Sequence, residues 1–262
     1  MSKRIDSDSV RKVLKTDFVL IMHHSMLVLM VAGMSSIGWT SDRAFSERVD
    51  ERRRMVETQL SGAGRITIND PATREAMLKV PRHAFVPDAV KALAYEDSPL
   101  PIGHGQTISQ PYIVAVMTQA LALKPGMKVL EVGTGSGYQA AVLAEITPEV
   151  HTIEIIKPLY ETAKERLERL GYRSVRVYYG DGYYGLPQEA PFDGIIVTCA
   201  ALHIPPSLYD QLKPGGRMVI PVGGKFEVQR LLVITKDPDG QRRSESLGPV
   251  RFVPLIRGPE KN

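Results

Sequence analysis

The chain has 262 residues, of which 43% are hydrophobic and 24% are charged, and its formal net charge is +4. This length suits one domain of ordinary size, and the single cysteine, Cys199, excludes an intramolecular disulfide and a cysteine-rich metal site. Residues 1–54 hold ten basic and seven acidic residues, a net charge of +3, which leaves +1 for the rest of the chain. So small a charge argues against a nucleic-acid substrate, which needs a basic face to neutralise phosphates.

The N-terminal segment contains an uncharged stretch at residues 18–39, preceded by five basic residues. Its 22 residues are long enough to cross a bilayer or to form the core of an export signal, although no clear AxA cleavage site follows. Three interpretations stay open: an export signal or anchor, a start codon assigned too early, and a helix that packs on the domain. We expect an extension at residues 1–54 and one domain at residues 55–262.

Residues 81–112 are rich in proline and glycine and have few periodic apolar positions. This composition predicts irregular structure laid over the rest of the domain. Because long loops inside compact domains are usually functional, the segment is a candidate for substrate contacts.

A glycine-rich motif, MKVLEVGTGSG, occupies residues 127–137 and is followed by the helical run YQAAVLAEI. The motif predicts a short strand through Glu131, a tight turn and a helix whose first amide groups face a ligand. A dinucleotide site requires GxGxxG, and here the third glycine position holds Tyr138. The remaining pattern, ExGxGxG, resembles that of class I S-adenosylmethionine (AdoMet) methyltransferases. A turn that binds no ligand is the structural alternative.

Alternating strands and helices follow, which predicts an α/β, doubly wound, mostly parallel sheet of the Rossmann-like type. Glu154 ends a strand 21 positions after Gly133, close to the ~20 typical of a carboxylate that binds ribose hydroxyls. Asp181 and Gly182 end the next strand, so Gly133, Glu154 and Asp181 should meet at one rim of the sheet. Glu154 could equally be an ordinary surface residue, and Asp181 could cap a turn. Further elements are expected at residues 156–171 (a helix that ends at Gly171), 192–200 (strand), 205–216 (a helix and its stop), 217–223, 229–237 and 250–256 (strands).

Cys199 and the histidines can be explained as structural residues, without a catalytic or metal-binding role. Cys199 lies in IIVTCA, which favours a small buried residue at a strand end over a reactive thiol. His83 and His104 have no spaced His, Cys or carboxylate partner, so no metal site is expected.

Several segments together resemble the protein-L-isoaspartate O-methyltransferase family over residues 55–255. They are PRHAFVP (81–87), PLPIGHGQTISQP (99–111), VLEVGTGSGYQAAVLA (129–144), GDGYYG (180–185), QLKPGGRMVIPVG (211–223) and VRFVPL (250–255). The resemblance implies methyl transfer from AdoMet to the free α-carboxylate of L-isoaspartyl residues in damaged proteins, followed by cyclisation of the ester to a succinimide.

The resemblance also implies roles for individual residues. Ser109 matches the family's active-site serine, and we interpret its hydroxyl as a donor that orients the substrate carboxylate. Substrate contacts are expected from His83, Gln110 and Pro111, whereas His104 looks like a variable loop position. Cofactor contacts are expected from Thr107, Ile108, Glu131, Gly133, Thr134, Gly135, Ser136, Gly137, Glu154, Asp181, Gly182 and Gln229.

The alternatives are a class I methyltransferase that acts on a small molecule or RNA, and a non-catalytic AdoMet-binding module. The expected partners are isoaspartyl proteins and peptides, with no nucleic acid, and a membrane only if residues 18–39 are translated and retained. An exported enzyme would be separated from cellular AdoMet. We therefore expect a cytoplasmic monomer, with export or anchoring through residues 18–39 as the alternative.

Overall fold

The computed structural model describes residues 43–62, 64–224 and 227–258. The compact unit starts at Ala44, and the expected boundary at residue 54 falls inside helix α2 (Val49–Gln59). Ala44, Arg52 and Met55 are buried, so residues 44–54 belong to the folded unit. Residues 18–39 lie outside the described part, and their three interpretations stay predictions. No helix in the described ranges is long and apolar enough to cross a membrane.

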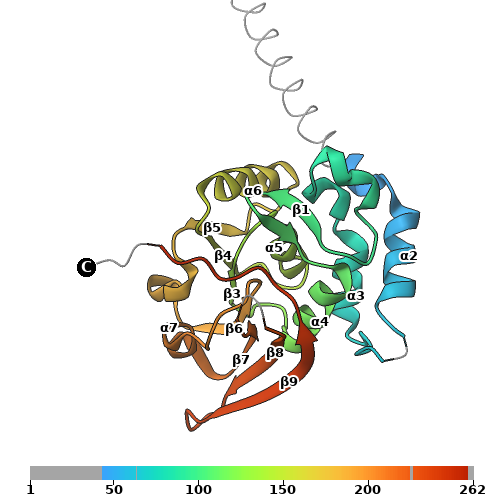
Figure 1. The fold of residues 1–262 in the computed structure, drawn as a ribbon. Helices are drawn as coiled ribbons and strands as arrows, with labels where there is room; N and C mark the ends of the chain where they lie inside the picture. Colours follow the sequence, from blue (N-terminus) through green and yellow to red (C-terminus); the bar gives the residue numbers. More distant parts are fainter. Residues whose placement is uncertain (1–42, 63, 225–226, 259–262) are drawn as a thin grey trace, which may run out of the picture. The chain divides into compact units, whose positions relative to one another are not determined.

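A seven-stranded sheet in the order β5-β4-β3-β6-β7-β8-β9 forms the centre of the molecule (Figure 1). Its first five strands in this order are parallel, and β8 and β9 continue the sheet as an antiparallel hairpin. The mostly parallel, doubly wound sheet expected from the sequence is confirmed. The strands are β3 (Val129–Val132), β4 (Val150–Glu154), β5 (Arg176–Tyr179), β6 (Phe192–Val197), β7 (Leu212–Val222), β8 (Gln229–Lys236) and β9 (Arg242–Val250).

The central strands β3 and β4 are buried along their whole length because helices cover both faces of a parallel sheet. The remaining α-helices are α3 (Pro71–Lys79), α4 (Pro111–Leu121), α5 (Tyr138–Ala144), α6 (Lys157–Arg169) and α7 (Pro206–Asp210). Short 3-10 helices are η1 (Arg82–Phe85), η2 (Asp88–Leu93), η3 (Gly182–Tyr184) and η4 (Pro187–Glu189).

Helix α6 illustrates how the apolar pattern sets the packing. Leu159, Ala163 and Leu167 are buried on one face, as their spacing predicts. The helix ends in a Schellman motif: Gly171 has φ 88°, and the amide of Tyr172 donates to the carbonyl of Leu167 at 2.9 Å.

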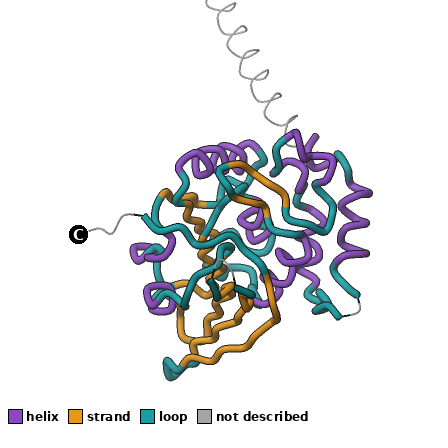
Figure 2. Tube along the Cα trace, in the orientation of Figure 1, coloured by secondary structure: helices purple, strands orange, loops and turns teal. Residues whose placement is uncertain are grey.

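Two segments differ from the sequence-based expectation. Residues 81–112 are not irregular, because they contain η1, η2 and a hairpin of β1 (Leu100–Gly103) and β2 (Gln106–Ile108). The prediction of a strand at residues 250–256 is wrong. Strand β9 ends at Val250, and residues 251–258 form no strand pairing apart from one bridge between Ala200 and Pro254. We call residues 251–258 the C-terminal strap; it crosses the face seen in Figures 1 and 2.

The helix expected at residues 205–216 is shorter than predicted. It ends at Asp210, and Leu212 already belongs to β7, so the KPGG segment lies in a strand.

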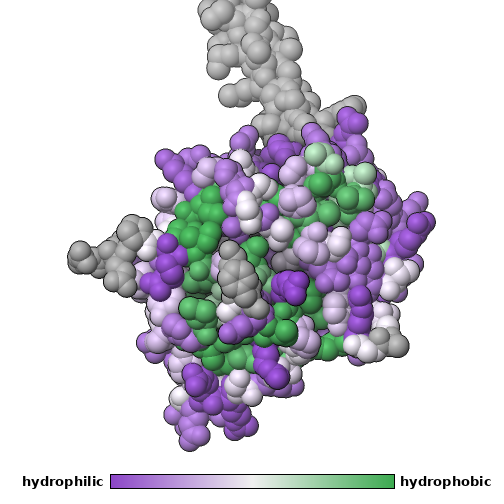
Figure 3. All heavy atoms as spheres, in the orientation of Figure 1, coloured by the Kyte–Doolittle hydropathy of each residue, from purple (hydrophilic) through white to green (hydrophobic). Residues whose placement is uncertain are grey.

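On the face seen in Figure 1, hydrophobic residues gather around the middle and hydrophilic ones lie mostly at the periphery (Figure 3).

Candidate functional site

The turn after β3 is built by backbone geometry that only glycine supplies at low cost. Gly133 has φ 97°, and a Cβ atom there would lie 2.6 Å from the hydroxyl oxygen of Thr198. That hydroxyl donates to the carbonyl of Gly133 at 2.7 Å. Thr198, which sequence reasoning missed as a site residue, therefore fastens the glycine turn to the end of β6. The available signal was its place directly after an apolar strand, at the same rim.

Glu154 lies beside this turn, as predicted. Its Oε2 accepts a hydrogen bond from the amide of Gly135 at 2.8 Å, and its Oε1 accepts from the amide of Ile156 at 2.9 Å. The side chain is buried and lines a pocket next to the glycines. Each oxygen of the carboxylate thus accepts one hydrogen bond from a backbone amide group, and further lone pairs remain on both oxygens.

Glu131 is fully buried on β3, the strand next to the one that carries Glu154. Its Oε2 accepts from the hydroxyl of Thr152 at 2.6 Å, whereas its Oε1 has no hydrogen-bond partner among the described residues. Burial raises the pKa of Glu131 to about 8, and the charge of Glu154 adds to the rise while the hydrogen bond from Thr152 opposes it. A buried acceptor without a donor is costly, so the geometry suits a ligand that brings an N–H group or a positive charge.

Three adjoining pockets surround the glycine turn, and Thr107 and Thr198 line all of them. The loop pocket holds about 540 Å³ of empty space between Gly133, Glu154 and the strap. The inner pocket, about 310 Å³, borders Glu131, Thr134 and Ser136, and the outer pocket, about 1040 Å³, lies between β2, α4 and the strap.

Ser109 lines both the inner and the outer pocket, so it stands where the two meet. Of the other predicted residues, Thr107, Gly135 and Gly182 line the loop pocket, Ile108 lines the inner pocket and Gln110 lines the outer pocket. Pro111 begins α4, and Gly137 packs behind the turn, where a Cβ atom would meet Leu167 at 3.2 Å.

Three further predicted residues have other partners and, like Pro111 and Gly137, line none of these pockets. Asp181 caps η3 by accepting from the amide of Tyr183 and also accepts from Arg257 and Gly258 of the strap. Gln229 uses both atoms of its side-chain amide on the backbone of Phe252, at 3.0 and 2.6 Å. The third is His83.

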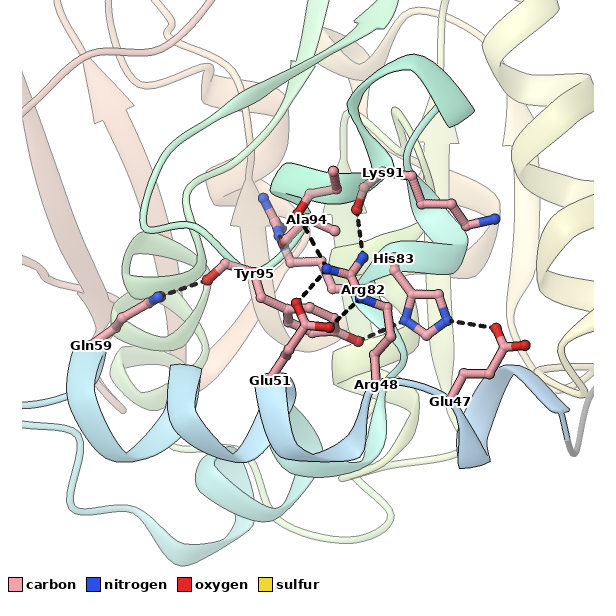
Figure 4. A network of polar contacts seen from close by, with 10 residues as sticks. Glu47, Arg48, Glu51, Gln59, Arg82, His83, Lys91, Ala94 and Tyr95 are labelled. Atoms are coloured by element: carbon pink, nitrogen blue, oxygen red, sulfur yellow. Dashed lines mark hydrogen bonds and ion pairs between the residues drawn. The ribbon is translucent and has the colours of Figure 1, made fainter.

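His83 is buried beneath the segment that leads into α2, away from the pockets (Figure 4). Its Nδ1 lies 2.8 Å from the hydroxyl of Tyr95, and its Nε2 lies 3.7 Å from a carboxylate oxygen of Glu47. Burial, together with the nearby positive charge of Arg48, lowers the pKa of His83 to about 4. The imidazole is neutral at pH 7 and serves packing in this structure.

Cys199 directly follows the β6 rim as expected, but it is half-buried rather than buried and lines the loop pocket. Burial raises the pKa of its thiol well above the usual range, and the charges of Glu154, Glu131 and Asp181 raise it further. The thiol is therefore protonated at neutral pH and a poor nucleophile.

Comparison with known proteins identifies the family. The family model for protein-L-isoaspartate(D-aspartate) O-methyltransferase matches residues 53–260. The chain is 56% identical to protein-L-isoaspartate O-methyltransferase 2 of Syntrophobacter fumaroxidans over 235 residues, covering 89% of this chain and 95% of the relative. It is 53% identical to protein-L-isoaspartate O-methyltransferase 1 of Cupriavidus necator, covering 88% of this chain and 92% of that one.

Solved structures agree. One protein-L-isoaspartate O-methyltransferase superposes with a TM-score of 0.69 at 29% identity, covering 79% of this chain and 65% of the other. A Plasmodium falciparum protein of the same description, in complex with S-adenosyl-L-homocysteine, has a TM-score of 0.67 at 25% identity and covers 80% and 98%. The chain belongs to the protein-L-isoaspartate(D-aspartate) O-methyltransferase family.

Proposed function

We propose that the chain transfers a methyl group from AdoMet to the free α-carboxylate of L-isoaspartyl residues in damaged proteins, which starts their repair through a succinimide. The observation that carries this proposal is the junction at Ser109, where the glycine-lined inner pocket, which contains the buried carboxyl group of Glu131, meets the larger outer pocket. Family membership supplies the substrate class.

The residues around the loop and inner pockets fit AdoMet. Glu154 can accept from ribose hydroxyls while it keeps its bonds to Gly135 and Ile156. The unpartnered Oε1 of Glu131 can accept from an ammonium group, and a positive charge there would favour the ionised carboxylate. When bound, AdoMet supplies an electrophilic methyl group on a sulfonium.

The protein has a modest chemical task, because a substrate carboxylate with a pKa of ~4 is already ionised at neutral pH. No general base is required. We infer that the hydroxyl of Ser109 donates to that carboxylate and holds one oxygen in line with the methyl group, and such positioning can contribute up to roughly 7–11 kcal/mol. Bound cofactor and peptide would together exclude water from this junction, which favours neutralisation of opposite charges.

Paired peptides test the proposal. Purified protein should transfer radiolabelled methyl groups from AdoMet to an isoaspartyl peptide and not to the peptide of the same sequence with a normal aspartyl linkage. Equal labelling of the two peptides would contradict the substrate assignment. Succinimide should then appear after the methyl ester, because the neighbouring amide nitrogen displaces methoxide more readily than it displaces a carboxylate oxygen.

We propose the cytoplasm as the site of action, because the reaction consumes AdoMet and the substrates include cellular proteins. N-terminal sequencing of the native protein tests the alternatives for residues 1–42. A first residue after position 40 excludes a packed helix at residues 18–39, and an intact Met1 in a membrane fraction contradicts the cytoplasmic proposal.

A further inference from the structure

A row of three polar side chains leads from the interior of the sheet to the inner pocket. Thr152 on β4 donates from its hydroxyl to Oε2 of Glu131 on β3 at 2.6 Å, and the two residues are neighbours in the parallel register. On its other side, the hydroxyl oxygen of Thr152 lies 2.6 Å from that of Thr134 in the glycine turn. All three side chains are buried, so bulk water does not compete for these hydrogen bonds.

The direction of donation along this row follows from the number of protons. An ionised carboxylate can only accept, and a threonine hydroxyl has one proton to donate. With Glu131 ionised, Thr152 therefore donates to Glu131, and Thr134 donates to Thr152. Oε2 is then occupied, and Oε1 has no partner among the described residues. Because each hydrogen bond polarises the next, the second hydroxyl strengthens the donation to Oε2.

The titratable groups that the structure describes around Glu131 come from the neighbouring elements. Burial raises the pKa of Glu131 to about 8, the hydrogen bond from Thr152 lowers it, and the charge of Glu154 at the end of β4 raises it. Cys199 follows β6, and burial keeps its thiol protonated at neutral pH. Tyr138 begins α5 and lines the inner pocket, and burial raises the pKa of its hydroxyl to about 12. Near neutral pH, Glu131 is therefore the group in this cluster that changes its charge.

Thr152 itself lines none of the three pockets, whereas Glu131 and Thr134 line the inner one. We propose that Thr152, supported by Thr134, is a positioning residue for the cofactor: its hydroxyl holds Oε2 of Glu131, so that Oε1 is left to accept the ammonium group of AdoMet. The proposal rests on the AdoMet site described under the proposed function. It extends that site to a buried residue that the sequence did not single out.

Thr152→Val tests this role, because valine has nearly the shape of threonine and the β-branch that suits a strand, but no hydroxyl. The dissociation constant of S-adenosyl-L-homocysteine should rise about tenfold at pH 7, as expected if loss of the hydrogen bond makes ionisation of Glu131 about tenfold less favourable. Thr152→Ser keeps the donor and should bind within about twofold of the wild type. Wild-type affinity in Thr152→Val would overturn the proposal.

Thr147 supplies a matched control. It is buried like Thr152, and its hydroxyl also donates at 2.6 Å, but to the backbone carbonyl of Met127 and not to a carboxylate. It lines none of the three pockets. Thr147→Val should therefore leave binding of S-adenosyl-L-homocysteine unchanged, although it too loses a buried hydrogen bond. Thermal unfolding of each variant verifies that the fold is retained.

An analogue of S-adenosyl-L-homocysteine without the amino group distinguishes positioning from a general weakening of the pocket. It should bind to the wild type more weakly than S-adenosyl-L-homocysteine does. Its affinity should be the same, within about twofold, for the wild type and for Thr152→Val, because it brings no ammonium group to Glu131. An equal loss for both ligands in Thr152→Val would show that this residue only maintains the pocket and would overturn the proposal.

Binding of S-adenosyl-L-homocysteine should also release a proton. At pH 7, below the pKa of about 8, Glu131 is mostly protonated in the ligand-free protein, and an ammonium group favours the ionised form. Calorimetry in buffers of different ionisation enthalpy should show release of nearly one proton by the wild type and of none by Glu131→Gln. Affinity should rise with pH and level off above the pKa, and in Thr152→Val the levelling should move to higher pH. A loss of affinity in Thr152→Val that is the same at every pH would contradict the proposed role.

Methylation assays separate failure of this proposal from failure of the proposed function. Thr152→Val should raise the KM for AdoMet, while kcat at saturating AdoMet stays within about twofold, because the proposed contact is with the amino group and not with the methyl group. If the variants and the analogue bind as expected to a protein that methylates no isoaspartyl peptide, the role of Thr152 stands and the proposed substrate is refuted. If isoaspartyl peptides are methylated and Thr152→Val binds like the wild type, the proposed function stands and the role of Thr152 is overturned.

Discussion

The two sides of the site are built in different ways. The inner side, around Gly133, Glu131 and Glu154, consists of buried backbone and carboxylates between adjacent parallel strands. The outer side consists of the hairpin β1–β2, which forms a separate two-stranded sheet, and the strap, which is held by the side chains of Gln229 and Asp181. We expect substitutions on the inner side to lower stability, whereas changes on the outer side should alter ligand binding more than stability.

The largest effect is expected on the inner side. Gly133→Ala imposes a left-handed φ on alanine and places its Cβ 2.6 Å from Thr198, which should lower the free energy of unfolding by about 3 kcal/mol and abolish binding of S-adenosyl-L-homocysteine. Gly171→Ala is the control, because φ is 88° there and no atom lies within 4 Å of the new Cβ. It should cost only about 1–2 kcal/mol. Equal losses in denaturant titrations would show that the contact with Thr198 is relieved easily.

Ser109 stands between the two sides, and its loss should affect turnover. Ser109→Ala removes one hydrogen bond to a charged group, so kcat should fall about 10- to 100-fold. Binding of S-adenosyl-L-homocysteine by calorimetry should stay within about twofold. A comparable loss of cofactor affinity would place Ser109 on the inner side alone. Ser109→Thr retains the hydroxyl and should recover part of the activity.

Glu131 on the inner side and His83, which lies outside the site, should respond to pH in opposite directions. The folded-state pKa of Glu131, about 8, lies above the usual value of 4.5, so the folded state holds the extra proton and stability falls as pH rises from 4.5 to 8. The folded-state pKa of His83, about 4, lies below 6.5, so the unfolded state binds the extra proton and stability falls as pH decreases from 6.5 to 4.

Each of these slopes is at most about 1.4 kcal/mol per pH unit. Glu131→Gln should remove the loss of stability between pH 6.5 and 8, and His83→Gln should remove the loss between pH 6.5 and 4, both measured by denaturant titration. Unchanged profiles would mean that these groups titrate alike in the folded and unfolded states.

Cys199 should show the smallest effect. Its protonated thiol at the pocket wall should react with iodoacetamide at least about 100-fold more slowly than an exposed thiol with a pKa of ~8.5. Since it is the single cysteine in the chain, labelling followed by mass spectrometry reports on it alone. Rapid labelling of the folded protein would show that the strap side of the pocket opens readily.

Sequence pattern alone determined the inner side of the site. The strands of the parallel sheet, the glycine turn and the position of Glu154 follow from local periodicity and from the rule that parallel strands end at one rim, so they require no knowledge of distant partners. The sequence also placed Ser109 through its resemblance to a family, and the structure locates this residue at the junction of two pockets.

Only the tertiary structure decided the outer side. Asp181 could bind a ligand or a distant cation, and folding brings it to Arg257, 76 residues away in the chain. Gln229 and His83 likewise found partners, Phe252 and Tyr95, that no local pattern indicates. The strap has the apolar composition of a strand but meets no neighbouring edge to pair with beyond Ala200. A side chain's role depends on which groups lie close to it in the folded structure, and spacing along the chain does not contain that information.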